Sequence, residues 1–120
     1  MGKKRRISAG KEPIYIYVST EAKSDFTAYA VQYGLDETAL ANLLIAREER
    51  VGRLPRLSKA TLEPSARTEK IVVHLAPERR QRFVRHVDDL GYSVSEAGAL
   101  LVIDELQQKW LERCVGIDSD

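Results

Sequence analysis

The sequence predicts a mainly helical α/β fold in which a β-α-α unit is duplicated and its two strands pair as one antiparallel ribbon with pseudo-twofold symmetry. Two observations support this prediction. The stretches EPIYIYVST, from residue 12, and EKIVVHLAP, from residue 69, both alternate in the manner of a half-buried strand. The second stretch follows the first by 57 positions, and the same offset relates Gly34 to Gly91 and Leu54 to Leu111. A fixed offset of this kind indicates a repeat.

The two strands each have one face for the core and one for the exterior, because successive side chains of a strand point to opposite sides. The residues expected to face the helices are Ile14, Ile16, Val18, Ile71, Val73 and Leu75. Those expected on the outer face are Tyr15, Tyr17, Lys70, Val72 and His74. Since a lone strand leaves its backbone N–H and C=O groups without partners, we expect the two strands to pair with each other.

A first helix is expected directly after each strand. Ser19 can cap the one that follows the first strand, and Pro77 suits the first turn of the one that follows the second. Spacings of three and four place one apolar stripe on each, made of Ala22, Phe26, Tyr29, Ala30 and Tyr33 in the first copy and of Phe83, Val87 and Leu90 in the second. Gly34 and Gly91 are expected to end these helices in the left-handed conformation.

A second helix is expected after each of these glycines. Ser93 and Glu96 have the spacing of a capping box, whereas Asp36 would cap the first copy without that glutamate. The apolar pattern predicts that the two helices run on towards Arg53 and Trp110.

The connector from Gly52 to Thr68 contains two prolines and no regular period, so it is expected to be a loop. Antiparallel pairing requires the chain to return along the second helix, a distance of roughly 25 Å that an extended connector, reaching on the order of 50 Å, spans easily. The expected layout is a basic arm (1–11), one pseudo-dimeric domain (12–116, with repeat one at 12–54, a linker at 55–68 and repeat two at 69–116) and a tail (117–120).

Composition excludes several classes of protein. The chain has 120 residues, of which 43% are hydrophobic and 31% charged, which is typical of one folded domain. No apolar stretch has the length of a transmembrane helix or of a signal-peptide core, so no membrane partner is expected. The single cysteine, Cys114, excludes an internal disulfide and is typical of a reducing cytoplasm.

A strand followed by two helices, used in pairs with these caps and turns, resembles the ribbon-helix-helix DNA-binding family. The most specific stretch is IVVHLAPERRQRFVRHVDDLGYSVSEA, residues 71–97. The resemblance implies binding to double-stranded DNA, with the outer face of the ribbon in the major groove, where base edges can be distinguished. The residues that it places against DNA are Tyr15, Tyr17, Lys70, Val72 and His74.

The resemblance also implies that the N-terminus of each second helix holds a phosphate, where free N–H groups and the helix dipole attract an anion. Carried over by position, these residues are Ser93, Val94 and Ser95 in the second copy and Thr38 in the first. Asp36 and Glu37 depart from the family pattern because carboxylates repel a phosphate. The second copy is therefore expected to hold a phosphate strongly and the first copy to hold one weakly.

Four basic residues near the start, Lys3, Lys4, Arg5 and Arg6, are expected to act as an arm along phosphates or in a minor groove. The fused tandem arrangement also resembles the T-DNA enhancer (overdrive)-binding proteins of the agrobacterial VirC operon and the relaxosome accessory proteins of conjugative plasmids. That likeness implies a non-catalytic factor of the bacterial cytoplasm that works beside a relaxase or other transfer-complex proteins. A fused pseudo-dimer needs no second copy, so a monomer is expected.

Catalysis is not expected, because the chain contains no Gly-rich phosphate loop and no nucleophile with a recognisable base beside it. His74 and His86 lack companions at ligand spacing, so neither a metal nor a cofactor is expected. Two alternative functions stay open. One is a ribbon-helix-helix repressor or antitoxin-like regulator that binds an operator. The other is a protein-interaction module whose DNA face has decayed, which Asp36 and Glu37 would favour.

Overall fold

The computed structural model describes residues 12–58, 62 and 66–115. Two strands, β1 (Glu12–Val18) and β2 (Glu69–Leu75), form one antiparallel sheet, as the sequence predicted. Seven residue pairs join them, from Glu12 opposite Leu75 to Val18 opposite Glu69. The helices are α1 (Thr20–Gln32), α2 (Glu37–Val51), α3 (Pro77–Asp89), α4 (Val94–Gln108) and α5 (Trp110–Val115). A short 3-10 turn, Leu54–Arg56, follows α2.

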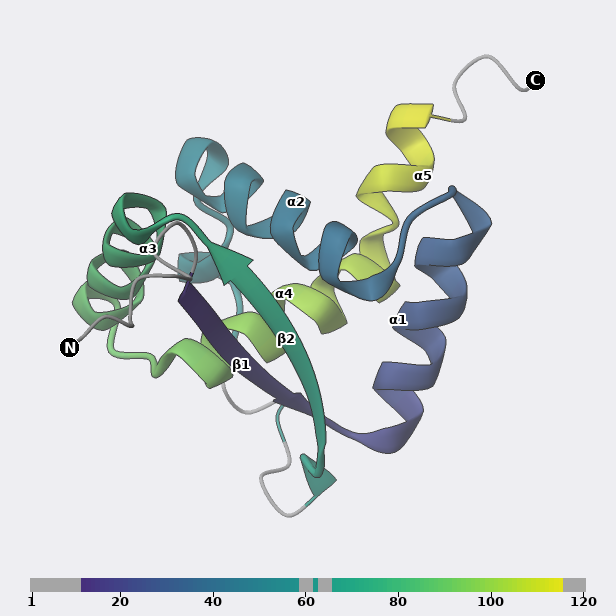
Figure 1. The fold of residues 1–120 in the computed structure, drawn as a ribbon, viewed down its shortest axis with the longest axis horizontal. Helices are drawn as coiled ribbons and strands as arrows, with labels where there is room; N and C mark the ends of the chain where they lie inside the picture. The colour runs from purple at the N-terminus through teal and green to yellow at the C-terminus, as the bar shows by residue number, and fades with distance from the viewer. Residues whose placement is uncertain (1–11, 59–61, 63–65, 116–120) are drawn as a thin grey trace, which may run out of the picture.

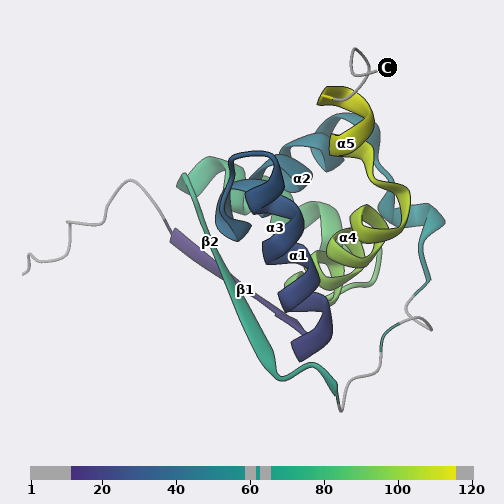
Figure 2. The same ribbon diagram turned by 90° about the vertical axis from the view of Figure 1, so that its right-hand side faces the viewer.

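The two strands and the helices make two layers. Figure 2 shows the strands along one side of the molecule and the helices on the other. The six inward strand residues predicted above are all buried, with exposed fractions of 3% or less, and they pack on Phe26, Phe83 and the apolar side chains of α2 and α4. The alternation of the two strands therefore decides which face of the sheet meets the core.

The helix ends follow the caps that the sequence contains. Ser19 accepts a hydrogen bond from Ala22 N at 3.0 Å, and Asp36 accepts one from Ala39 N at 2.7 Å. Ser93 and Glu96 form the predicted capping box. Gly34 and Gly91 follow α1 and α3 with φ of 79° and 84°, a conformation that glycine adopts without a steric penalty.

The last helix contains a break that the sequence did not predict. The apolar pattern predicted a helix running on towards Trp110; α4 ends at Gln108, and a separate helix, α5, begins at Trp110. Between them Lys109 has a left-handed backbone, with φ of 56°, and its N–H donates to Glu105 O at 2.8 Å. This C-cap without glycine changes the direction of the chain, so that Leu111 N can reach the buried carboxylate of Glu105 at 2.8 Å.

Helix α4 lies directly against β1 at Gly98, whose position leaves no room for a side chain. A Cβ atom there would come within 3.0 Å of three carbon atoms of Ile16. Gly98→Ala is therefore expected to destabilise the protein by roughly 1–2 kcal/mol, since the clash outweighs the gain in helix propensity. Chemical denaturation would measure this change. Unchanged stability in Gly98→Ala would contradict the close packing of α4 on β1.

Candidate nucleic-acid interface

Six residues point outward from the sheet. Pro13 is one of them, and the other five, here called the ribbon face, are Tyr15, Tyr17, Lys70, Val72 and His74. The two tyrosines are 45% and 39% exposed, Lys70 and His74 are exposed, and Val72 is half-buried. Within the described residues the helices all lie on the opposite side of the strands (Figure 1, Figure 2). The structure thus brings together all five residues that the sequence assigned to this face.

The two strands contribute different side chains to the ribbon face: the aromatic ones come from β1 and the basic ones from β2. Tyr15 lies opposite Val72, and Tyr17 lies opposite Lys70. The Lys70 ammonium lies 5.0 Å from the centre of the Tyr15 ring, within the range of a cation–π contact. The polar groups offered are two phenol hydroxyls, one ammonium and one imidazole, all able to contact phosphates or base edges.

The free edge of β2 is held by side chains from α1 and α2. Lys23 Nζ donates to Lys70 O at 2.8 Å, Thr38 Oγ1 donates to Val72 O at 2.8 Å, and Asn42 Nδ2 donates to His74 O at 3.4 Å. These carbonyls belong to outward-facing residues, so the contacts fix the backbone that carries the ribbon face.

The edge of β1 is held in a similar way from α3, α4 and the connector. Arg80 Nε donates to Pro13 O at 3.4 Å, and Tyr17 N donates to Ser95 Oγ at 3.0 Å. Arg67 Nε donates to Tyr17 O at 2.8 Å. Side chains that occupy backbone groups on both edges also limit the addition of a further strand.

The N-terminus of α4 contains Ser93, Val94 and Ser95, the residues predicted to hold a phosphate. The Ser93 hydroxyl accepts from Glu96 N, while the Glu96 carboxylate accepts from Ser93 N at 2.9 Å. The Ser95 hydroxyl accepts from Tyr17 N and from Arg67. Both hydroxyls therefore have internal partners, and the groups with no acceptor inside the helix are the N–H groups of its first turn, at Val94 and Ser95.

The N-terminus of α2 differs in charge. Asp36 caps the helix, and Glu37 accepts from Lys23 at 2.9 Å and from Thr27 at 2.6 Å. Lys23 therefore offsets the charge of Glu37 locally. The hydroxyl of Thr38, which the sequence also placed at a phosphate, is turned towards β2, where it donates to Val72 O.

Sequence reasoning missed the most buried polar cluster. The side chain of Glu48 on α2 is fully buried and accepts from Arg53 N at 2.7 Å and from Leu54 N at 3.2 Å. It also lies 2.8 Å from His86 Nε2 on α3. One carboxylate thus joins the end of α2 to a helix that lies far along the chain.

Glu105 on α4 makes contacts that match those of Glu48. Tyr29 takes the place of His86, and Leu111 takes the place of Leu54. Glu105 accepts from Tyr29 on α1 at 2.6 Å and from Leu111 N at 2.8 Å. Each of these three residues is separated from its counterpart by 57 positions, and Gly52 and Lys109, the left-handed caps of α2 and α4, are separated likewise. The offset of 57 positions, which the two glutamates share with the residues that contact them, was the signal in the sequence that could have revealed the pair.

Burial, followed by the hydrogen bond to Glu105, raises the pKa of Tyr29 above its ordinary value of 10.0. A group whose pKa is raised in the folded state stabilises the fold below its unfolded pKa, and this contribution is lost as the pH rises past about 10. Wild-type protein is therefore expected to lose stability above pH 10 more steeply than Tyr29→Phe. Urea denaturation of both proteins between pH 8 and 11 would measure this, and parallel curves would contradict the assignment.

A bidentate ion pair also connects α4 with the connector. Arg53 donates to the two carboxylate oxygens of Asp104 at 2.6 and 2.7 Å, and Asp104 is buried. The hydrogen bond to Asp104 raises the pKa of Arg53. The Arg53 side chain is therefore bound to a partner within the fold.

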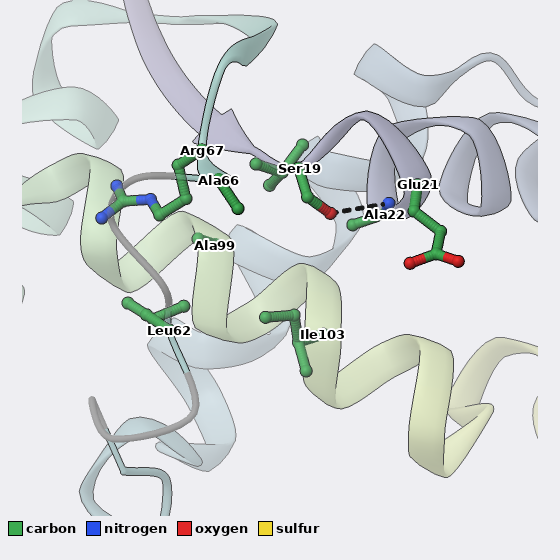
Figure 3. A pocket seen from close by; sticks show the side chains of 9 residues that line it. Ser19, Glu21, Ala22, Leu62, Ala66, Arg67, Ala99 and Ile103 are labelled. Atoms are coloured by element: carbon green, nitrogen blue, oxygen red, sulfur yellow. Dashed lines mark hydrogen bonds between the residues drawn. The ribbon is translucent and has the colours of Figure 1, made fainter.

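A pocket of about 270 Å³ lies at the junction of β1 and α1, beside α4 (Figure 3). Ser19, Glu21 and Arg67 contribute its polar groups. Leu62, Ala99 and Ile103 contribute apolar surface. The Ser19 hydroxyl in it is occupied by the cap of α1. The pocket flanks the β1 edge of the sheet.

The predicted basic arm, with Lys3, Lys4, Arg5 and Arg6, lies outside the described residues. Within residues 12–58, 62 and 66–115, no cluster of three or more histidine, cysteine or acidic side chains could hold a metal ion. In the same part of the chain, no helix combines the length and the apolar character needed to cross a membrane.

Comparison with known proteins adds no relative. No protein-family model matches the chain, and neither a curated protein nor a solved structure matches it. The geometry of the ribbon face and of the helix ends around it is therefore the basis for a functional assignment.

Proposed function

We propose that this chain is a single-chain, duplicated ribbon-helix-helix protein that binds double-stranded DNA by placing the ribbon face in the major groove. The observation that carries the proposal is the contrast between the two sides of one small sheet. Its inner side chains are 3% exposed or less, whereas Tyr15, Tyr17, Lys70 and His74 are exposed on the other side. A two-stranded ribbon of this kind has dimensions that the major groove admits.

Duplication is supported by the equal lengths of corresponding elements. Both strands have 7 residues, both first helices have 13, and both second helices have 15. The glycine turns after α1 and α3 and the buried glutamates of α2 and α4 recur at the same offset of 57 positions. The two halves exchange contacts, since Tyr29 of the first bonds Glu105 of the second.

Phosphate contacts are assigned to the backbone at the N-terminus of α4. The N–H groups of Val94 and Ser95 and the positive end of the helix dipole attract an oxyanion there. The corresponding end of α2 carries Asp36 and Glu37, which weaken the attraction even though Lys23 pairs with Glu37. DNA is therefore expected to be held more tightly on the α4 side of the ribbon.

The role that we propose for this binding is non-catalytic. The likeness of the tandem sequence to the VirC-operon enhancer-binding protein of agrobacterial T-DNA transfer supports an accessory factor in DNA processing, acting beside a relaxase that cuts the DNA. A regulator of the repressor or antitoxin type would use the same face, and its target would be a promoter. The preferred DNA sequence therefore separates these two roles.

Fluorescence anisotropy with two labelled duplexes, a T-DNA border with its enhancer and a scrambled control, tests the proposal between about 50 and 200 mM salt. Steep loss of affinity with salt is expected, because each phosphate contact releases counterions. Preference for the border duplex over the scrambled control supports the transfer role. A third labelled duplex, which carries the protein's own promoter, is titrated in the same way, and preference for it would support a regulator. No binding to any of the three duplexes at low salt would overturn DNA binding.

A second candidate function, a protein-interaction module, is favoured by two observations. Acidic side chains occupy the N-terminus of α2, and the ribbon face includes two tyrosines and a valine but no arginine. A surface of this composition also suits a protein partner. Binding to a transfer-complex protein by a chain that fails to bind any duplex would select this function.

A further inference from the structure

Tyr17 on β1 and His74 on β2 occupy corresponding positions of the two strands, but different kinds of residue hold their backbone carbonyls. Tyr17 and His74 are separated by 57 positions, and each has its backbone carbonyl at a free edge of the sheet. Asn42 on α2 donates to the His74 carbonyl, but the residue 57 positions after Asn42 is Ala99, which has no polar side-chain group. Arg67 of the connector takes over this contact, with Nε 2.8 Å from Tyr17 O.

Arg67 also holds the other backbone group of Tyr17 indirectly. Its Nη2 donates to Ser95 Oγ at 2.6 Å, and that same oxygen accepts from Tyr17 N at 3.0 Å. Tyr17, Ser95 and Arg67 thus form a closed ring of hydrogen bonds between β1, α4 and the connector. The corresponding contact at His74 is a single longer bond of 3.4 Å. Tyr17 is consequently fixed more firmly than His74.

We propose that Arg67 is a positioning residue of the DNA-binding face, which holds the β1 edge so that the Tyr17 side chain is presented to DNA in one orientation. This inference rests on the proposed function. It makes the connector part of the binding site, although no connector residue belongs to the ribbon. Arg67 acts through the strand, so its loss should change the order of β1 and leave the number of phosphate contacts unchanged.

The test compares Arg67→Ala with a matched control, Arg56→Ala, which removes the same charge from an exposed connector residue. In the free protein, amide hydrogen exchange at Tyr17 is expected to become at least tenfold faster in Arg67→Ala and to stay unchanged in the control. With DNA, Arg67→Ala is expected to weaken binding about tenfold, the usual effect of losing a charged hydrogen bond. The salt slope of this variant, meaning the slope of log affinity against log salt concentration, should equal that of wild type.

A rescue variant separates positioning from loss of folding. Removing the Arg67 side chain leaves space in the pocket that Ala99 lines, so Ala99→Asn in the Arg67→Ala background can supply the donor that Asn42 supplies to His74. Recovery of slow exchange at Tyr17 together with recovered affinity is the expected result. A salt slope lowered by about 0.9, with exchange at Tyr17 unchanged, would instead make Arg67 a phosphate contact and overturn the proposal.

Failure of the inference can be distinguished from failure of the proposed function. If wild-type protein binds no duplex, DNA binding fails, whatever the exchange rates are. If wild type binds DNA and Arg67→Ala exchanges faster at Tyr17 but binds equally well, DNA binding stands and the positioning role is wrong.

Discussion

Replacing Glu48 with alanine is expected to lower the free energy of unfolding by roughly 3–5 kcal/mol, the usual cost of removing one member of a buried, hydrogen-bonded charged cluster. The loss leaves three groups without their acceptor: Arg53 N, Leu54 N and His86 Nε2. Two of them are backbone donors that start the connector, so the end of α2 should loosen together with the contact to α3. Chemical denaturation at neutral pH would measure the change.

Glu49→Ala provides the control for this prediction, because Glu49 is the next residue of α2 and pairs only loosely with Arg82, at 3.7 Å. Its effect is expected to stay within about 0.5 kcal/mol, as is usual for an exposed pair. Glu105→Ala should resemble Glu48→Ala, since Glu105 accepts from Tyr29 and Leu111 N in the same manner. A loss below 1 kcal/mol in both buried variants would show that the two clusters do not hold the halves together.

The second large effect is expected at the ribbon face. The double variant Tyr17→Ala Lys70→Ala should bind DNA about 10- to 100-fold more weakly at 100 mM salt, because it removes one of the two phenols and the only ammonium of that face. If Lys70 contacts one phosphate, the salt slope should also fall by about 0.9. Anisotropy titrations at several salt concentrations would give both quantities.

Arg113→Ala is the charge-matched control for this variant. Arg113 is exposed on α5, which lies away from the strands (Figure 2). Loss of one positive charge there should change affinity less than twofold. Equal losses in the control and in the ribbon variant would indicate that binding depends on net charge alone, which would remove the ribbon face from the proposed interface.

The strands and their faces could be predicted because the physical rule behind them is local. In the stretch from Ile14 to Val18, alternation alone decides which side chains meet the core. Helix caps are also local, so Ser19 and Ser93 were assigned correctly. The break at Lys109 could not be predicted in this way. Lysine has no intrinsic preference for the left-handed conformation, and the contact of Leu111 N with Glu105 stabilises it only in the folded chain.

The edges of the ribbon and the buried carboxylates depend on contacts between distant residues. A serine or threonine in a first turn is typical of a cap, but Ser95 and Thr38 bond the strands because the helix ends lie beside them in space. A glutamate within a helix is ordinarily exposed, and Glu48 is buried only because α3 and the connector cover it. Such positions follow from tertiary packing, which the pattern of one segment does not contain.

The covalent link between the two strands has a consequence for behaviour on dilution. In a ribbon built from two separate chains, assembly is bimolecular, so the fraction assembled falls as the protein becomes scarce. Here β1 and β2 belong to one chain, and the connector keeps them at an effective concentration in the millimolar range. The ribbon should therefore be complete in a cell that contains only a few molecules. A chain cleaved in the connector would lose this advantage and would require a second-order encounter to form the ribbon again.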